Sequence, residues 1–382
     1  MLQERRASKL YYRICCGIVF FIAASASFNG YFDKWHFREA GVVLGASDNA
    51  TDGYGFKEIL DGTAARPYIY RRLLPDVANW LNKITPEDVK DQVYNFRTNQ
   101  GRLADVMLGS SPSISQNHVY AFRYLVLEAI VFFFAWLSVY AMYLVCRALG
   151  FRLLISIFAP TLMILLVPYF MSVGGYMWDY PELAFMALTI WMALKFDWWW
   201  ILPLAVLGAW NKESFVIFTL TLYPLLRSRS SQLSASIGAG ILFAVSLIVY
   251  IAIRAQFVHN SGGTVMVEWI RQIVFFLRPV NFIDVEMTYG IITFRVFTLL
   301  PVILIVWGMI RSWHKLPKTI RQHAKIAAGI NFPLYFLFCA PGELRDLSML
   351  YVTFMLSLAV NLMGPARRML TDETPAQNQS GA

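Results

Sequence analysis

Long runs of apolar residues, several of them close to 20 residues in length, dominate this sequence of 382 residues. A run of about 20 apolar residues is enough for a helix to cross the hydrocarbon core of a bilayer. Only 15% of the residues are charged, whereas soluble proteins carry about 25%. The pattern therefore predicts an all-α fold, a polytopic transmembrane helical bundle that forms a single membrane domain over residues 1–382.

The apolar runs predict about ten spans. The first run also matches a signal peptide, with Ala24-Ser25-Ala26 as its cleavage motif, and in either case the chain continues outside from residue 30. The runs on either side of Phe196 are short enough to be tilted or re-entrant. The predicted spans are 14–28, 122–145, 153–171, 183–194, 198–210, 215–226, 237–253, 291–310, 326–340 and 349–362.

Positive charges are unevenly distributed between the connections. With a cytoplasmic amino terminus, the short inside connections hold many lysines and arginines, and the short outside connections hold only Lys212 and Arg345. This positive-inside asymmetry predicts a multi-pass plasma (inner) membrane protein with a large periplasmic first loop over 29–118. It also accounts for the net charge of +9 without a nucleic-acid partner. Residues 365–382 are predicted to form a flexible cytoplasmic tail.

The first loop contains an amphipathic segment. Apolar residues recur at helical spacing, which predicts an amphipathic interfacial helix at the membrane surface. They are Leu73, Val77, Trp80, Leu81 and Ile84. A helix of a small soluble subdomain would show the same spacing. A second stripe of this kind lies in the later outer loop, over 254–287.

Motifs for nucleotide binding, zinc proteolysis and serine hydrolysis do not occur in this sequence. The five histidines are scattered, and the four cysteines lie in apolar runs without the spacing of metal ligands. No cofactor is identified and no metal ligand is assigned, while a requirement for a divalent metal is left open.

Polar motifs gather on the predicted outer side. Charges beside short apolar spans are costly unless they are paired or solvated, so these loops are candidates to converge on one site. Chance clustering of charges at helix ends is the alternative. The candidate substrate-binding residues are Tyr70, Arg71, Arg72, Asp179, Glu182, Lys212, Glu213, Glu343 and Arg345.

The arginines are the candidate ligands for an anion. On a helix, Arg71 and Arg72 would point about 100° apart, so that only one faces a given ligand. A guanidinium donates two parallel hydrogen bonds to a phosphate, and Arg345 is a second candidate for this role. Asp179 and Glu182 either line the same site or occupy the first turn of a helix, where the helix dipole favours acids.

Two further polar segments also allow two interpretations. Lys212 and Glu213 either close a turn as an ion pair or face a substrate cavity. The Glu343 to Asp346 segment either pairs its charges internally or presents Arg345 to a ligand. Asp33, just beyond the first span, is either a general base at the edge of the hydrocarbon or a charge beside an aromatic belt.

This combination of features resembles the GT-C superfamily of multispanning glycosyltransferases, which use polyprenyl-phosphate-linked sugars. In that class the first outer loop is large and carries interfacial helices, and an acid near the end of the first span is the catalytic base. The resemblance assigns this catalytic role to Asp33. Several families of the class have a second acid beside it, whereas Asp33 is followed here by Lys34. The stretch from Gly62 to Pro75 is similar to a segment of bacterial membrane proteins grouped with envelope polysaccharide genes.

The resemblance implies transfer of a sugar from a polyprenyl-phosphate-linked donor to an envelope glycan or lipid acceptor at the periplasmic face. The expected partners are the lipid bilayer, that donor and that acceptor. A polymerase or ligase of lipid-linked glycans, a transporter or flippase, and a non-catalytic scaffold are the alternatives. Transporters tend to have internal repeats and polar groups at mid-membrane. Here no strong repeat occurs, and the polar groups gather at one face.

Overall fold

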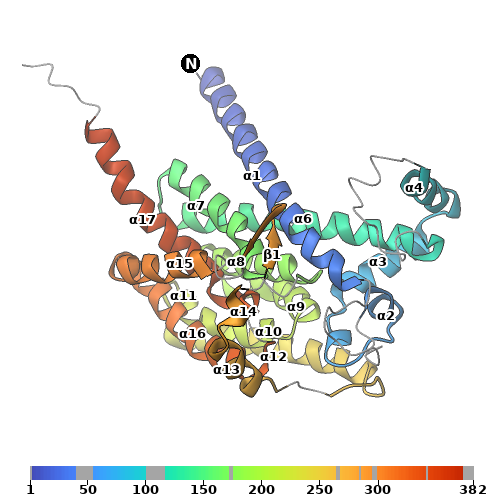
Figure 1. Ribbon diagram of the computed structural model, residues 1–382. Helices are drawn as coiled ribbons and strands as arrows, with labels where there is room; N and C mark the ends of the chain where they lie inside the picture. Colours follow the sequence, from blue (N-terminus) through green and yellow to red (C-terminus); the bar gives the residue numbers. More distant parts are fainter. Residues whose placement is uncertain are drawn as a thin grey trace, which may run out of the picture.

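The computed structural model describes residues 2–39, 55–99, 117–171, 175–263, 267–283, 285–294, 299–340 and 343–372. Nearly all regular structure in these ranges is helical (Figure 1). The elements are α1 (Leu2–Glu39), α2 (Phe56–Asp61), η1 (Tyr68–Tyr70), α3 (Leu73–Ile84), α4 (Glu87–Asn99), α6 (His118–Ala148), α7 (Leu153–Leu166), η2 (Val167–Phe170), α8 (Asp179–Lys195), η3 (Trp198–Ile201), α9 (Leu202–Asn211), α10 (Ser214–Phe218), η4 (Thr219–Leu222), α11 (Tyr223–Arg227), α12 (Gln232–Gln256), α13 (Trp269–Leu277), α14 (Val280–Ile283), β1 (Val285–Thr288), β2 (Ile291–Phe294), α15 (Leu299–Ser312), η6 (Trp313–Lys315), α16 (Lys318–Phe338), η7 (Leu344–Leu350) and α17 (Tyr351–Asp372).

Five helices in the described ranges are long and apolar enough to cross a membrane, which indicates a membrane protein. The predicted count of about ten spans is not confirmed. The remaining helices in the predicted spans are shorter or less apolar, such as α8, which has 17 residues. The five spanning candidates are Ile14–Tyr31, His118–Ala148, Leu153–Phe170, Gln232–Gln256 and Leu344–Met363.

The chain between α8 and α12 folds back and forth in short helices. Lys212, in the turn between α9 and α10, contacts the first turn of α8, so α9 returns to the level at which α8 began. At the opposite end, the chain reverses at Asp197 and the link between α11 and α12 lies beside it. At 1.5 Å per residue α8 is about 25 Å long, so its two ends are separate environments.

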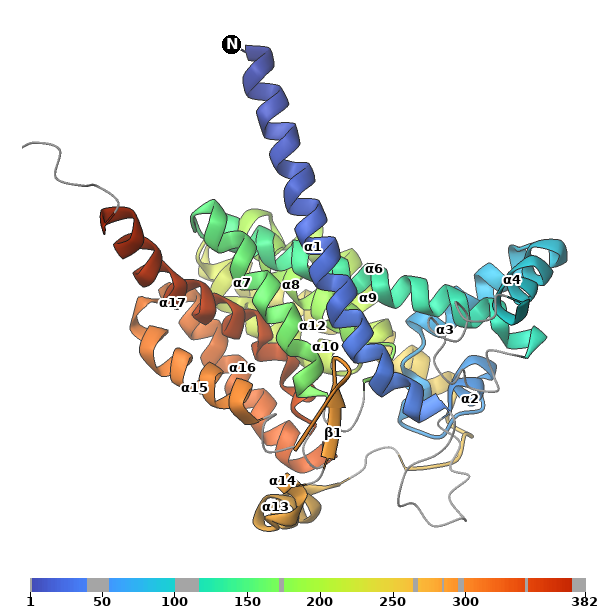
Figure 2. The ribbon, with the colours of Figure 1, turned by 45° about the horizontal axis from the view of Figure 1, so that its top comes forward.

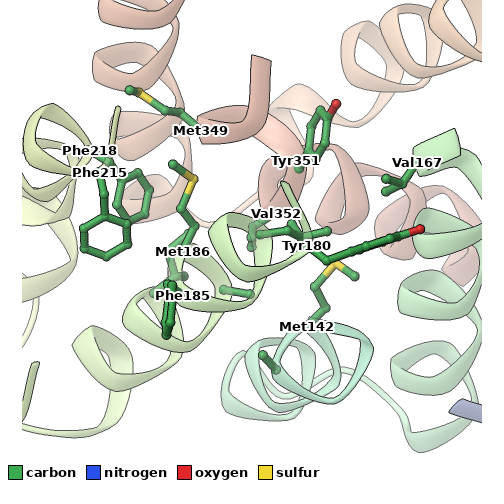
Figure 3. Packing of buried hydrophobic residues seen from close by; sticks show 14 of the residues in the cluster. Met142, Val167, Tyr180, Phe185, Met186, Phe215, Phe218, Met349, Tyr351 and Val352 are labelled. Atoms are coloured by element: carbon green, nitrogen blue, oxygen red, sulfur yellow. The ribbon is translucent and has the colours of Figure 1, made fainter. Parts of the chain in front are cut away.

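The apolar core surrounds α8. Figure 3 shows Phe185 and Met186 of α8 on the side of Phe215, while Tyr180 points toward Val167. These side chains are almost completely buried, and α8 packs against α6, α9, α11 and α17. Packing of this kind holds helices together within a bilayer, where the hydrophobic effect between them is weak.

The carboxy-terminal half of α1 is fixed to the chain just before α8. The Tyr31 hydroxyl donates a hydrogen bond to the Tyr176 carbonyl, and the Tyr31 ring meets Tyr180 edge-on at 4.8 Å. Gly175 permits this approach, because a Cβ there would lie 2.1 Å from Cε2 of Tyr31. Farther from α8, the amino-terminal half of α1 and the end of α17 project beyond the bundle (Figures 1 and 2).

The first loop packs against the start of α6. Arg123 of α6 pairs with Asp61 at 3.3 Å and donates to the Asn79 side chain at 3.0 Å, joining α2 and α3 to α6. Within the predicted amphipathic stripe, Leu73 is buried, whereas Trp80 is 60% exposed. The amphipathic helix thus exists as α3, and its location at a membrane surface stays a prediction.

The segment between α14 and α15 contains a β-hairpin of β1 and β2, which was not predicted from the sequence. The predicted span over 291–310 is wrong in its first part, because residues 291–294 form β2. Its later part corresponds to α15. Tyr289 and Gly290 both have positive φ, as a tight hairpin turn requires. The predicted stripe over 254–287 corresponds to α13, which buries Gln272 against the end of α16 and exposes Leu277.

Candidate functional site

Four segments far apart in the sequence meet at the start of α8. They are the end of η1, the first turn of α8, the turn between α9 and α10, and the start of η7. Their ionisable side chains form one network, called here the charge cluster. Its members are Arg71, Asp179, Glu182, Lys212, Glu213, Glu343, Arg345 and Asp346.

Lys212 is the centre of the charge cluster. Its Nζ lies 2.8 Å from Oε2 of Glu182, 2.9 Å from Oδ1 of Asp346 and 4.0 Å from Oδ1 of Asp179. Burial opposes the charged form, but the charges of Asp346 and Glu182 outweigh it, so the pKa of Lys212 is raised. Lys212 therefore ties α8 to η7 through its ion pairs with Glu182 and Asp346.

Glu182 accepts hydrogen bonds from three different segments. Besides Lys212, its donors are the hydroxyl of Ser214, at the start of α10, and the hydroxyl of Ser348 at 2.9 Å. Glu182 and Asp179 also occupy the first turn of α8, where the helix dipole favours acids. Asp179 and Glu182 therefore both stabilise the start of α8 and belong to the charge cluster.

Arg345 is enclosed by the cluster. Its Nη1 lies 3.0 Å from Oδ2 of Asp179, its Nη2 lies 3.0 Å from Oε2 of Glu343, and its guanidinium covers the Tyr176 ring at 4.4 Å. The side chain is 5% exposed. Both terminal nitrogens are therefore committed to carboxylates, which leaves this arginine poorly placed to receive an external anion.

Arg71 and Glu213 form the exposed edge of the cluster. The Nη2 and Nε atoms of Arg71 donate to the two carboxylate oxygens of Glu213 at 2.6 Å and 3.1 Å. Burial opposes the ionisation of Glu213, but the charge and hydrogen bonds of Arg71 outweigh it and lower the pKa of the carboxyl. The Arg71 side chain is 12% exposed and that of Glu213 is 32% exposed. The side chains of the other ion pairs in the cluster are at most 16% exposed, so Arg71 and Glu213 form its most accessible pair.

Aromatic rings flank the Arg71 guanidinium. It lies 4.6 Å from the Trp178 ring centroid and 5.8 Å from that of Tyr68. Trp178 in turn stacks on Tyr176 at 4.5 Å with an interplanar angle of 11°. Cations over aromatic faces are attracted by the ring quadrupole, which helps to fix the orientation of the guanidinium.

Arg72 and Tyr70 lie outside the cluster. Arg72 is buried and donates to Oδ1 of Asp76 at 2.6 Å and to the Ile59 carbonyl. The two arginines bind different partners, Glu213 and Asp76. The predicted arrangement of both on one helix is wrong, because η1 ends at Tyr70 and Arg71 has non-helical backbone angles. Tyr70 is buried too, and its ring meets that of Tyr250 edge-on at 6.3 Å.

Asp33 lies on α1, which continues to Glu39. Its side chain is outside the part of the chain whose side chains the structure describes. The backbone places it about 3 Å of helix rise, and roughly half a turn, beyond Tyr31. Tyr31 contacts Tyr176 beside the cluster, so the backbone of α1 at this level lies at the same end of the bundle as the cluster.

Several contributors were not among the predicted site residues. The sequence suggests partners for Asp346 only within its own segment, whereas in the structure it pairs with Lys212. Ser348 and Tyr176 gave no sequence signal, since single serines and tyrosines are common in apolar helices. Among the described residues, no three or more His, Cys, Asp or Glu side chains are grouped so as to hold a metal ion.

No protein-family model matches this chain, and a search of curated proteins finds no match either.

Proposed function

We propose that this chain is a membrane glycosyltransferase, which moves a sugar from a polyprenyl-phosphate-linked donor to an envelope glycan or lipid acceptor at the periplasmic face of the inner membrane. The proposal combines the resemblance to the GT-C superfamily with the chemistry of the charge cluster. The lipid tail of the donor would lie among the apolar helices, and its phosphate would bind at the edge of the cluster.

The observation that carries the proposal is that the Arg71 guanidinium is only partly engaged by hydrogen bonds. Glu213 engages two of its nitrogens, while Nη1 makes no hydrogen bond to any residue in the described part of the chain. An arginine has five N–H donors, so this guanidinium can hold Glu213 and still donate to a phosphate oxygen. Arg72 and Arg345 are buried and paired, which makes Arg71 the preferred phosphate ligand.

The cluster explains why Arg71 is suited to this task. Glu213, Trp178 and Tyr68 hold the guanidinium in place before a ligand arrives, so little side-chain freedom is lost on binding. Phosphate leaves as an anion in the transfer, and a fixed cation beside it stabilises the developing charge.

Asp33 would act as the base. The acceptor hydroxyl oxygen attacks the anomeric carbon, the bond from that carbon to the phosphate oxygen breaks, and polyprenyl phosphate leaves with the bonding electrons. The proton of the acceptor hydroxyl passes to the Asp33 carboxylate. A transfer of this kind requires no nucleotide, which agrees with the lack of nucleotide-binding motifs in the sequence.

The test is sugar transfer by the purified protein in lipid nanodiscs. Labelled polyprenyl-phosphate glucose, mannose and galactose serve as donors, and membranes from cells lacking the gene serve as acceptor. Wild type should transfer label from one of these donors. Asp33→Asn should lower the rate about 100-fold or more, as expected for loss of a general base.

Glu87→Gln is the matched control, since Glu87 lies in α4 and pairs only with the nearby Lys90 among the described residues. This variant should transfer at the wild-type rate. Asp33→Asn transferring as fast as Glu87→Gln would remove Asp33 from the mechanism, and a wild type inactive with all donors would contradict the activity.

A transporter is a second candidate, favoured by one feature. The chain breaks between α9 and α10 at Lys212 and Glu213, and such broken helices carrying charges are typical of transporter binding sites. The two activities differ in their products. A flippase would move the labelled donor across the bilayer of a vesicle unchanged, whereas the proposed enzyme would consume it.

A further inference from the structure

The opposite end of α8 contains an open cavity of about 250 Å³. One wall comes from the end of α8 and η3, and the other from the link between α11 and α12. Its polar lining side chains include Asp197 on the first wall and Arg229 and Ser234 on the second, with Phe196 and Trp199 beside Asp197. This end of α8 is about 25 Å from the charge cluster, so the cavity is a separate feature.

The two charges of the cavity do not pair with each other. Within the described ranges, neither the Asp197 nor the Arg229 side chain makes a hydrogen bond or an ion pair, and both residues are exposed. Opposite charges on facing walls of one small cavity normally attract each other into contact. Their separation leaves space for a ligand that carries both an anion and a cation.

We propose that this cavity binds the head group of a zwitterionic phospholipid with a primary ammonium, such as phosphatidylethanolamine. Arg229 donates to the phosphate, as a guanidinium does readily, and the Ser234 hydroxyl supplies a further donor. Asp197 accepts hydrogen bonds from the ammonium, and Trp199 offers an aromatic face to the same cation.

The surroundings favour a lipid over a soluble molecule with the same groups. Leu233 and Ile237, which precede and follow the cavity residue Ser234 on α12, are 70% and 48% exposed, so α12 offers exposed apolar side chains to an acyl chain. Trp199 is 52% exposed, as is common for tryptophan at the boundary between head groups and hydrocarbon. The cavity is also smaller than the roughly 300–1,000 Å³ typical of sites that enclose a whole ligand.

This inference does not depend on sugar transfer. It requires that the helices lie in a bilayer and that the cavity at the end of α8 is level with the lipid head groups. The charge cluster is not involved, so a defect in the cavity leaves the chemistry at the other end of α8 unchanged.

The test is lipid retention measured by native mass spectrometry. The purified full-length protein is mixed in mild detergent with equal amounts of phosphatidylethanolamine and phosphatidylglycerol of the same chain length. Wild type should retain phosphatidylethanolamine in preference to phosphatidylglycerol. Arg229→Gln should lower its retention about fivefold, the effect of about 1 kcal/mol. Asp197→Asn should remove the preference, because the ammonium loses its partner and the anionic lipid is no longer repelled.

Lys195→Gln is the control, since Lys195 is exposed at the same end but does not line the cavity. It should retain both lipids as wild type does. Arg229→Gln or Asp197→Asn behaving like this control would overturn the site, as would a preference of wild type for phosphatidylglycerol. Displacement of the lipid by an equal concentration of glycerophosphoethanolamine would show that the acyl chains contribute nothing and would overturn the assignment to a lipid.

Discussion

The charged side chains at the two ends of α8 differ in whether they are paired. At its start, eight ionisable side chains from four segments are buried or partly buried, and each of them has an ion-pair partner within 3.0 Å. At its end, Asp197 and Arg229 line one open cavity and neither has a partner among the described side chains. The first arrangement holds the protein together, and the second is available to bind something else.

The contrast follows from the environment of each end. A buried charge must be paired, since removing an ion from water is expensive. An exposed charge is stabilised by water and has little to gain from a fixed partner. The charge cluster therefore leaves only its edge, at Arg71 and Glu213, in a position to exchange a partner for a ligand.

The largest expected effect is loss of the central cation. Lys212→Met leaves Glu182 and Asp346 buried without their shared partner and should destabilise the protein by about 3–5 kcal/mol. Thermal unfolding in detergent measures the change. Lys195→Met, at the other end of α8, should be nearly neutral, because Lys195 is exposed. Equal unfolding temperatures for the two variants would show that Lys212 contributes no more to stability than Lys195 does.

A glycine near each end of α8 provides the next comparison. A Cβ at Gly175 would meet the fully buried Tyr31 ring at 2.1 Å, and one at Gly238 would meet the partly exposed Trp198 at 2.6 Å. Gly175→Ala should destabilise by about 1–3 kcal/mol, since the Tyr31 ring has no space to move. Gly238→Ala should have a smaller effect, because Trp198 can shift.

The assignment of the Gly175 effect to Tyr31 can be checked with a second substitution. Combining Gly175→Ala with Tyr31→Ala should give less destabilisation than the sum of the two single variants, because the clash disappears with the ring. Strict additivity of the three unfolding free energies would mean that the two side chains do not meet.

The smallest effect is expected at the edge of the cluster, and it depends on pH. Glu213 has a lowered pKa in the folded protein, so its stabilising pair with Arg71 is present above the unfolded pKa of 4.5 and is lost as the pH falls through the folded pKa. Glu213→Gln should lower stability by about 1 kcal/mol near pH 7. The difference from wild type should shrink as the pH falls below 4.5. A difference that grew on acidification would contradict the pairing.

The helical nature of the chain and the segments of the charge cluster could be predicted from the sequence. Apolar runs and the positive-inside asymmetry depend only on local composition, and they located polar motifs such as those around Asp179 and Lys212. The amphipathic spacing beginning at Leu73 likewise identified α3.

The pairing of individual charges could not be predicted, because it depends on how distant segments pack. Arg345 bonds to Glu343 nearby but also to Asp179, which is 166 residues away in the chain. The hairpin of β1 and β2 was missed because Ile291 to Phe294 is as apolar as the helix that follows it, and short apolar runs do not distinguish strand from helix.

The most direct measurement of the central claim is the affinity for decaprenyl phosphate compared with decaprenol, for wild type and Arg71→Lys in nanodiscs. Lysine keeps the charge but loses the planar fork that holds Glu213 and a phosphate together. We predict that wild type binds the phosphate form about tenfold or more tightly than the alcohol, and that Arg71→Lys loses most of this preference while remaining folded. An equal preference in both proteins, or none in wild type, would contradict the account.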